Sequence, residues 1–298
     1  MKKKALLFGL NYRGTESELG GCINDTIRLQ KTLQTYLGYS AEDITLLTDD
    51  TAVTPTKANM EKAFETLLTE IKEQDIREVW ISYSGHGSYV TDTSGDEQDG
   101  QDEVLVPLDY TTNGFIHDDW IHAFFEKIPA TCFVVPIWDA CHSGSMGDLQ
   151  WLSQYSHTAT KRQVRRRVRV RRRGRWVRVW RTTSVNGPAS WKWEENQENK
   201  TSEVQARILS LSGCRDQQTS ADVFNQETNS WGGALTNAII EAIESTQTSL
   251  TCKELCLKVN EHMKKTKMTQ RPVIASTFKL QPGHIFFTKA PCCITTSL

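Results

Sequence analysis

The sequence predicts an α/β fold in which a mostly parallel central sheet lies between two layers of helices. Short apolar runs alternate with segments of helical periodicity through the first 150 residues, and the same alternation returns after residue 205. Strand–helix–strand alternation is typical of parallel strands joined by crossover helices. With 298 residues, 38% of them hydrophobic, the chain is long enough for one large domain or two small ones.

Each predicted strand is a short apolar run bounded by polar or small residues. The strands are expected at residues 4–10, 43–48, 78–85, 131–139, 206–214 and 272–278. Pro136 falls inside the fourth run, where it removes a backbone donor from the ladder. We therefore expect it near the end of that strand or at a bulge.

Five segments have the spacing of amphipathic helices. Residues 22–37 carry apolar side chains at positions 23, 27, 29, 33 and 37, which recur at helical intervals. The pair Thr54-Pro55 predicts the start of a second helix, running to about Lys72, because proline is favoured in a first turn. The other three are expected at 118–128, 231–245 and 251–265.

The pattern predicts three parts: 1–148, an insertion at 149–205, and 206–298. The insertion is polar, lacks periodicity, and is typical of a flexible segment. Its basic tract at 161–181 holds 12 of the 35 Lys and Arg residues and no acid. The rest of the chain therefore carries 23 basic residues against 36 acidic ones.

Two strand ends carry candidate catalytic residues. The run EVWISYS leads into Gly85-His86-Gly87, and FVVPIW leads into Asp139-Ala140-Cys141-His142. Sites in open α/β sheets form at the carboxyl ends of strands, so His86 and Cys141 meet if these strands are neighbours. Adjacent strand residues point to opposite faces, which favours His86 over His142 as the partner. A buried structural thiol and a metal-ligand pair remain the alternatives for Cys141.

Four sequence motifs resemble those of the metacaspases. GCINDT (21–26), YSGHG (83–87), DACHSG (139–144) and LSGCRDQQTSAD (211–222) occur in the order of that family's motifs. The resemblance implies a caspase-like three-layer α-β-α sandwich, with a p20-like part at 1–148 and a p10-like part at 206–298. It also implies a cysteine endopeptidase that cleaves after arginine or lysine, in which Cys141 is the nucleophile and His86 the base.

The resemblance extends to substrate binding and to a metal. It implies an S1 pocket formed by Cys22, Asp25, Ser84 and Asp139, and carboxylates there suit a basic P1 side chain. Backbone N–H groups of Gly87 and Cys141 are expected to stabilise the oxyanion. The stretch 92–119 is rich in acids and holds no Lys or Arg; composition alone favours a solvated loop, and calcium binding is the alternative. By resemblance the Ca²⁺ ligands are Asp102, Asp118, Asp119 and Asp148, with Asp99 as the alternative to Asp102.

The basic tract at 161–181 allows more than one function. In a protease that prefers arginine or lysine it predicts self-processing, as in a zymogen, or a pseudosubstrate in the acidic cleft before cleavage. As an alternative, a caspase-like scaffold would bind nucleic acid or an acidic surface through it. A peptidase that cleaves after asparagine or aspartate is a third hypothesis, which the acidic pocket residues disfavour.

Cysteine usage and hydropathy bear on the compartment. Eight scattered cysteines without a disulfide framework are typical of reduced thiols. The apolar stretch ALLFGL is too short for a signal peptide, and no apolar run approaches 18 residues. We therefore expect a cytoplasmic protein with no membrane contact, acting on protein or peptide substrates and on itself. By resemblance it is expected to be a monomer.

Overall fold

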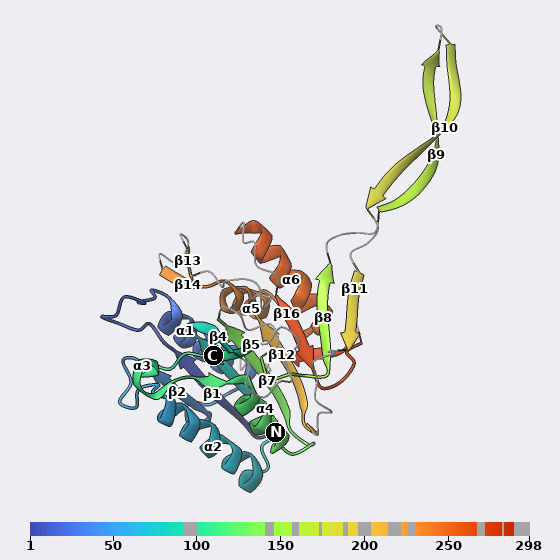
Figure 1. Cartoon of the computed structure of the whole chain (residues 1–298). Helices are drawn as coiled ribbons and strands as arrows, with labels where there is room; N and C mark the ends of the chain where they lie inside the picture. Colours follow the sequence, from blue (N-terminus) through green and yellow to red (C-terminus); the bar gives the residue numbers. More distant parts are fainter. Residues whose placement is uncertain are drawn as a thin grey trace, which may run out of the picture.

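Figure 1 shows the computed structural model of the chain. It describes residues 1–91, 101–140, 146–156, 161–172, 175–186, 190–195, 204–213, 222–225, 230–266, 272–281 and 283–288.

An eight-stranded sheet forms the centre of the molecule, with the strand order β11-β8-β16-β12-β7-β3-β1-β2. In chain order these strands are β1 (Lys3–Gly9), β2 (Ile44–Thr48), β3 (Glu78–Ser84), β7 (Phe133–Asp139), β8 (Trp151–Ser156), β11 (Ser190–Glu195), β12 (Arg207–Ser212) and β16 (Val273–Ser276). The ladders from β2 through β1, β3 and β7 to β12 are parallel. The ladders that add β16, β8 and β11 are antiparallel. The predicted mostly parallel sheet is confirmed.

Helices cover both faces of this sheet, as Figure 1 shows. The helices are α1 (Cys22–Leu37), α2 (Lys57–Gln74), α3 (Tyr110–Asn113), α4 (Asp118–Glu126), α5 (Ala234–Glu244) and α6 (Cys252–Lys265), with a 3₁₀ turn at Ala41–Asp43. Side chains of β1 alternate between two cores. Ala5 and Leu7 pack with α1, α5 and α6, whereas Leu6 and Phe8 pack with α2 and α4. This alternation produces the three layers that the sequence predicts.

Smaller ladders surround the main sheet. They comprise β4 (Gly87–Thr91), β5 (Gln101–Leu105) and β6 (Ile116–His117); β9 (Lys161–Arg172) and β10 (Arg175–Asn186); β13 (Asp222–Asn225) and β14 (Ser230–Gly233); β15 (Ser249–Thr251) and β17 (Ile285–Thr288). The sequence analysis expected none of these pairs. Most have strands of two to five residues, which are too short for periodicity to reveal.

Helix ends follow local capping chemistry. Thr56 caps α2 by accepting the Asn59 N–H, so this helix begins two residues after Pro55. At α6 the side chain of Thr251 accepts the Glu254 N–H while the carboxylate of Glu254 accepts the Thr251 N–H, which is a capping box.

Pro136 lies in the interior of β7, and the expectation that it would lie at a strand end or a bulge is wrong. It pairs with Ile81 of β3 on one side. On the other side, the β7–β12 ladder gives Val135 and Pro136 no partner residue. The carbonyl of Trp138 accepts the Gly213 N–H at 3.0 Å, so alternate residues of β7 direct their backbone groups toward β12. The missing N–H of Pro136 therefore falls on the side where the ladder is interrupted.

The predicted insertion at 149–205 contributes strands to the fold. β8 and β11 pair with each other, and β8 pairs with β16, so the insertion extends the main sheet by two strands. β9 and β10 form a hairpin that projects away from the sheet in Figure 1. In the part of the chain that the structure describes, none of the helices is both long and apolar enough to cross a bilayer.

Candidate active site

The carboxyl ends of β3 and β7 lie side by side. These parallel neighbours end their register with Ser84 opposite Asp139. The Gly85 N–H lies 3.4 Å from the carbonyl oxygen of Asp139, so the two chains stay in contact one residue further. The predicted base His86 follows Ser84 by two residues, and the predicted nucleophile Cys141 follows Asp139 by two. Cys141 itself lies outside the described residues.

Contacts from several segments hold the half-buried His86. Its Nε2 lies 2.8 Å from the carbonyl oxygen of Ser17, and its ring centroid lies 4.7 Å from that of Tyr12. When Nε2 donates to this carbonyl, Nδ1 of the neutral ring is the atom that can accept a proton. The backbone N–H of His86 donates to the Tyr12 hydroxyl at 3.0 Å, and its carbonyl accepts from the Tyr83 hydroxyl at 2.7 Å.

Two buried tyrosines support the backbone before His86. The hydroxyls of Tyr12 and Tyr83 lie 3.0 Å apart, and Tyr12 donates to the carbonyl of Val106 at 2.6 Å. A Cβ at Gly85 would lie 2.9 Å from the Tyr83 hydroxyl and 3.0 Å from that of Tyr12, so only glycine fits there. Burial, and secondarily the charge of Tyr83, raises the pKa of Tyr12 well above its ordinary value. Its phenol therefore stays protonated and keeps donating.

The residues predicted to line the S1 pocket gather beside the same strand end. Asp25, in the first turn of α1, is fully buried, and its Oδ2 lies 3.4 Å from the Ser84 hydroxyl. Ser84 is the register partner of Asp139, which is also buried. Cys22 is the buried first residue of α1, three residues before Asp25. Two buried carboxylates thus lie next to the strand end that leads to His86.

The amino end of α5 contacts both carboxylates. The Gly233 N–H donates to Asp25 Oδ2 at 2.5 Å, and the Thr236 N–H donates to Asp139 Oδ2 at 2.7 Å. Asn237 Nδ2 lies 3.4 Å from Asp25 Oδ1. A helix amino end carries partial positive charge, so α5 compensates the two buried acids. A Cβ at Gly233 would overlap Asp139 Oδ2, so glycine is required at this contact.

A second group of acids lies where β5, β6 and α4 meet. Asp118 and Asp119 form the first turn of α4, and Asp102 and Glu103 lie on β5. The β5–β6 register, continued by one residue, brings Glu103 opposite Asp118. Asp102, Glu103 and Asp118 are all buried, whereas Asp119 is half-buried. Three of these four acids are predicted calcium ligands, and Glu103 is an addition that the structure supplies.

Burial raises the pKa of Asp118 from its ordinary value of 3.8 to about 6. The charges of Asp119 and Asp102 add to the rise, while hydrogen bonding with Glu103 and with the Asp119 N–H opposes it. Asp118 Oδ1 accepts the Asp119 N–H at 2.9 Å. Its Oδ2 is buried and has no hydrogen-bond partner within the described ranges. Asp118 therefore retains a buried oxygen that is available to a cation.

Asp148, the fourth predicted ligand, follows a turn that is anchored to α4. The Nδ1 of His122 lies 3.0 Å from the carbonyl oxygen of Gly147. Asp148 is buried and has a left-handed φ of 43°, and Gly147 has a φ of 85°. A Cβ at Gly147 would lie 2.7 Å from the ring of Phe125, so two constraints require glycine before Asp148.

These acids fit calcium by their chemistry. Calcium takes six to eight oxygen ligands, and buried carboxylates with an unsatisfied oxygen are suitable donors. Among the residues that the structure describes, however, no group of three His, Cys, Asp or Glu side chains is placed to hold a metal ion. The four predicted ligands are all described, so the structure gives candidate oxygen donors of which no three converge on one ion. Asp99, the alternative to Asp102, lies outside the described residues.

Comparison with known proteins connects this geometry to a family. Residues 3–150 match the family model of the metacaspase, peptidase C14 domain. Metacaspase-1 of Pyricularia oryzae is 32% identical over 96% of this chain and 74% of its own length. Metacaspase-1 of Cryptococcus neoformans var. neoformans is 34% identical over 96% of this chain and 64% of its own. This chain belongs to the metacaspase family.

The resemblance found in the four motifs is thereby confirmed. Metacaspase-1A of Neurospora crassa is also similar, with 34% identity over 96% of this chain and 65% of its own length. This metacaspase chain spans just under two thirds of the length of the Cryptococcus and Neurospora relatives. The crystal structure of protein GSU0716 from Geobacter sulfurreducens has the same fold, with a TM-score of 0.55 and 18% identity over 95% of this chain and 96% of its own. The fold class expected from the resemblance is confirmed as well.

Several site residues of this metacaspase were missed by the sequence analysis. Tyr12 and the carbonyl of Ser17 contact His86 from the loop after β1, and Gly233 and Thr236 contact the carboxylates of Asp25 and Asp139 from the start of α5. The double glycine Gly232-Gly233 before a helix was a visible signal. The backbone carbonyl of Ser17 had none, because any residue supplies one.

Other thiols of this metacaspase lie in environments that suppress reactivity. Burial raises the pKa of Cys132 and of Cys252 to about 12, and that of Cys256 well above its ordinary value. A thiol becomes a nucleophile as its thiolate, so these three are structural.

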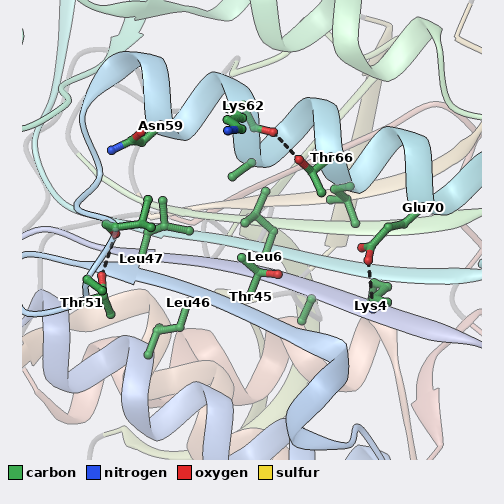
Figure 2. Close-up of a pocket in the computed structure, with 15 residues that line it drawn as sticks. Lys4, Leu6, Thr45, Leu46, Leu47, Thr51, Asn59, Lys62, Thr66 and Glu70 are labelled. Carbon is green, nitrogen blue, oxygen red and sulfur yellow. Dashed lines mark hydrogen bonds and ion pairs between the residues drawn. The ribbon is translucent and has the colours of Figure 1, made fainter.

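A cavity of about 490 Å³ lies apart from the candidate site. Figure 2 shows it between α2 and the strands β1 and β2, lined by Leu6, Leu47 and Lys62, and by the ion pair of Lys4 with Glu70 at 3.2 Å. None of the predicted site residues lines it. The cavity lies along the edge strand β2, beneath α2, and we assign it no role in catalysis.

Proposed function

We propose that this metacaspase is a cysteine endopeptidase that cleaves after arginine or lysine. The observation that carries the proposal is the pair of buried carboxylates, Asp25 and Asp139, at the strand end that leads to His86. A buried guanidinium or ammonium needs such partners, and arginine forms bidentate contacts with them. A P1 aspartate would meet like charge there, so the arrangement disfavours caspase-like specificity.

The proposed reaction is acyl transfer through a thiol. The sulfur of Cys141 attacks the carbonyl carbon after the basic residue, and His86 takes the thiol proton. The imidazolium then protonates the leaving amine as the C–N bond breaks and the thioester remains. Water, deprotonated by His86, hydrolyses the thioester and regenerates the thiol. The Ser17 carbonyl holds the ring, 2.8 Å from Nε2, so that Nδ1 serves as the base. The N–H groups of Gly87 and Cys141 are proposed to stabilise the oxyanion.

We further propose activation by calcium, held by Asp102, Asp118, Asp119 and Asp148. Bound calcium would neutralise clustered negative charge at the start of α4. Support comes from the burial of three of these acids and from the unsatisfied Oδ2 of Asp118. Because His122 of α4 contacts the carbonyl of Gly147, order at α4 can extend to the chain that follows Cys141.

Self-processing within 161–181 is part of the proposal. The tract is dense in arginine, which the proposed pocket accepts. Because β9 and β10 are hydrogen-bonded to each other, cleavage inside them requires the hairpin to open first. Incubation of the whole chain with Ca²⁺, followed by intact-mass measurement, should give fragments that end after arginine or lysine in this tract.

A monomer in the cytoplasm completes the proposal. β8 and β11 of the chain itself cover the edge of β16, which removes that strand as a pairing surface for a second copy. Among the described residues, Cys132, Cys252 and Cys256 form no disulfide, which suits a reducing compartment.

The decisive experiment compares fluorogenic peptides that end in arginine, lysine or aspartate, each with Ca²⁺ and with chelator. Hydrolysis after arginine and lysine only, and only with Ca²⁺, is expected. Cys141→Ala and His86→Ala should each reduce the rate at least about 10³-fold. Asp25→Asn should lower kcat/KM for the arginine peptide while leaving alkylation of Cys141 by iodoacetamide unchanged. Preferred cleavage after aspartate would overturn the specificity, and full activity with chelator would overturn the calcium requirement.

A further inference from the structure

The loop between β1 and α1 contacts His86 from two directions. Tyr12 packs against the imidazole, with ring centroids 4.7 Å apart, and its hydroxyl accepts the His86 N–H at 3.0 Å. The carbonyl oxygen of Ser17 lies 2.8 Å from His86 Nε2. Because both the backbone and the ring of His86 depend on this one loop, a group that holds the loop also holds the ring.

Tyr12 has a backbone conformation that needs support from outside the loop. Its φ is 52°, in the left-handed region that residues with bulky side chains rarely adopt. Such a conformation costs free energy and persists only where the surrounding structure fixes it. The turn at Tyr12 therefore requires a partner elsewhere in the fold.

Asp49 is the residue that fixes this turn. Its Oδ1 accepts the Asn11 N–H at 2.9 Å, and its Oδ2 accepts the Arg13 N–H at 3.1 Å. Backbone N–H groups that converge on one anion around a left-handed residue form a nest, which is a concave site for negative charge. Hydrogen bonds to a carboxylate are also about twice as strong as those between neutral groups. The two oxygens of Asp49 thus hold the residues on either side of Tyr12.

The order of strands in the main sheet places Asp49 at this turn. The parallel register of β1 and β2 ends with Gly9 opposite Thr48. Asp49 follows Thr48 directly, beside the point where the loop leaves β1. Thr51 Oγ1 accepts the Thr48 N–H at 2.8 Å and lies 2.8 Å from the Thr48 carbonyl oxygen, so the turn that carries Asp49 is closed by its own contacts.

A second connection runs from Tyr12 to the carbonyl beside the His86 ring. The Thr15 hydroxyl donates to the Tyr12 carbonyl at 2.7 Å and accepts the Ser17 N–H at 3.2 Å. The position of Ser17 therefore depends on the turn at Tyr12 through a single hydroxyl. His86 is linked to Asp49 both through Tyr12 itself and through Thr15 and Ser17.

We propose that Asp49 is a positioning residue of the peptidase site. By holding the turn at Tyr12, it keeps the Ser17 carbonyl on Nε2 of His86. The neutral ring then carries its proton on Nε2 and offers Nδ1 as the base. The inference rests on the proposed role of His86 as the base, and it adds a residue that lies outside the four sequence motifs.

Asp49 should affect the chemical step more than substrate binding. Asn11 Oδ1 accepts the Ile23 N–H at 3.1 Å, and the Asn11 carbonyl accepts the Leu19 N–H at 2.8 Å. These contacts hold the first turn of α1, which carries Asp25, and a substitution of Asp49 leaves them in place. We therefore expect kcat to fall while KM changes little.

The test compares Asp49→Asn with Asp50→Asn. The first variant keeps one acceptor oxygen and replaces the other by an amide NH₂, which cannot accept a backbone N–H. The second is the matched control, because Asp50 is the adjacent acid and pairs with the Arg13 side chain at 2.9 Å. Both members of that pair are exposed, so its loss has little effect.

Three readouts separate positioning from stability. Steady-state hydrolysis of an arginine peptide gives kcat and KM. Alkylation by iodoacetamide gives the reactivity of Cys141. The spectrum of ¹⁵N-histidine-labelled protein at alkaline pH, assigned with His86→Ala, shows which nitrogen of the neutral His86 ring carries the proton and needs no substrate.

Asp49→Asn should lower kcat at least about tenfold and change KM less than about twofold. Its spectrum should show both neutral tautomers of His86, where the wild type shows the Nε2–H form alone. Asp50→Asn should match the wild type within about twofold in kcat and show the wild-type tautomer. Added to His86→Ala, Asp49→Asn should cause no further loss of Cys141 alkylation, because its effect passes through the ring.

Unchanged kcat with an unchanged tautomer in Asp49→Asn would overturn the inference, as would an equal loss in Asp50→Asn. A further loss of alkylation in the His86→Ala background would also overturn it, since this would indicate a general disturbance of the fold. If the wild type hydrolyses neither arginine nor lysine peptides, the proposed function fails, and the tautomer comparison decides the inference alone.

A second pair of variants covers the case in which Asp49→Asn does not fold, as circular dichroism would show. Thr15→Val removes the hydroxyl between Tyr12 and Ser17, whereas Thr15→Ser retains it. The valine variant should show mixed His86 tautomers and a lower kcat, and the serine variant should behave as the wild type. A Thr15→Val protein with wild-type kcat and tautomer would then overturn the inference.

Discussion

Gly233→Ala tests the proposed S1 pocket. The φ of Gly233 is −67°, which alanine adopts without strain, so only the new Cβ matters. That atom would overlap Asp139 Oδ2 and come within 2.5 Å of its Cγ. The carboxylate must therefore move, and it then loses the 2.7 Å hydrogen bond from the Thr236 N–H. We expect destabilisation together with weaker binding of a basic P1 residue.

The magnitude follows from the contact that is lost. A hydrogen bond to a charged group contributes about 1.5–3 kcal/mol, and a displaced rotamer of Asp139 adds about 0.5–1.5 kcal/mol. The free energy of unfolding should fall by about 2–4 kcal/mol, which lowers Tm by roughly 4–10 °C in a chain of this size. Differential scanning fluorimetry measures Tm. Hydrolysis of an arginine peptide measures kcat/KM, which should fall at least tenfold, mainly through KM.

Gly283→Ala is the matched control, because a Cβ at Gly283 meets nothing within 4 Å. It should change Tm by less than about 1 °C, as surface substitutions usually do. The reasoning fails if Gly233→Ala is as stable as this control and hydrolyses the arginine peptide at the wild-type rate. Such a result would mean that α5 does not hold Asp139 in solution.

Three other predictions concern single groups. The folded-state pKa of Asp118, about 6, lies above its ordinary value, so the stability of the metal-free protein falls as pH rises from about 4 through 6. At pH 7.5, Asp118→Asn should therefore be more stable than wild type by a free energy of unfolding on the order of 2 kcal/mol, seen as a higher Tm. At pH 4 the two proteins should have nearly equal Tm, and an equal gain at both pH values would contradict the prediction. Tyr12→Phe removes the acceptor of the His86 N–H and the donor to the Val106 carbonyl. Steady-state kinetics should show kcat lowered at least tenfold with little change in KM. An unchanged kcat would show that Tyr12 does not position His86. Alkylation followed by peptide mass mapping should label Cys141 well before Cys132 or Cys252, whose pKa of about 12 keeps them protonated, and early labelling of either buried thiol would refute their assignment as structural.

The sequence predicts most of the main sheet and its helices within a few residues. Residues 22–37 form α1 with the predicted bounds, because their apolar spacing and the glycine at 38 are local signals. The strand β8 was not predicted, because its partner residues in β16 lie up to 125 residues away, and most of the small ladders have strands too short for periodicity. Pro136 shows the same limit: its tolerance inside β7 depends on which neighbour its missing N–H would have faced.

What the sequence by itself determined is the family of the chain, through its motifs; from these it predicts a nucleophile and a base at two strand ends, and carboxylates for a basic side chain. Residue type and order along the chain are enough for these, because each motif is contiguous. Only the tertiary structure decided which groups complete the site. The Ser17 carbonyl beside His86 and the N–H groups of α5 on Asp25 and Asp139 depend on strand order and on how α5 packs against the sheet. These are contacts between backbone groups and residues distant in the chain, and no local pattern encodes them.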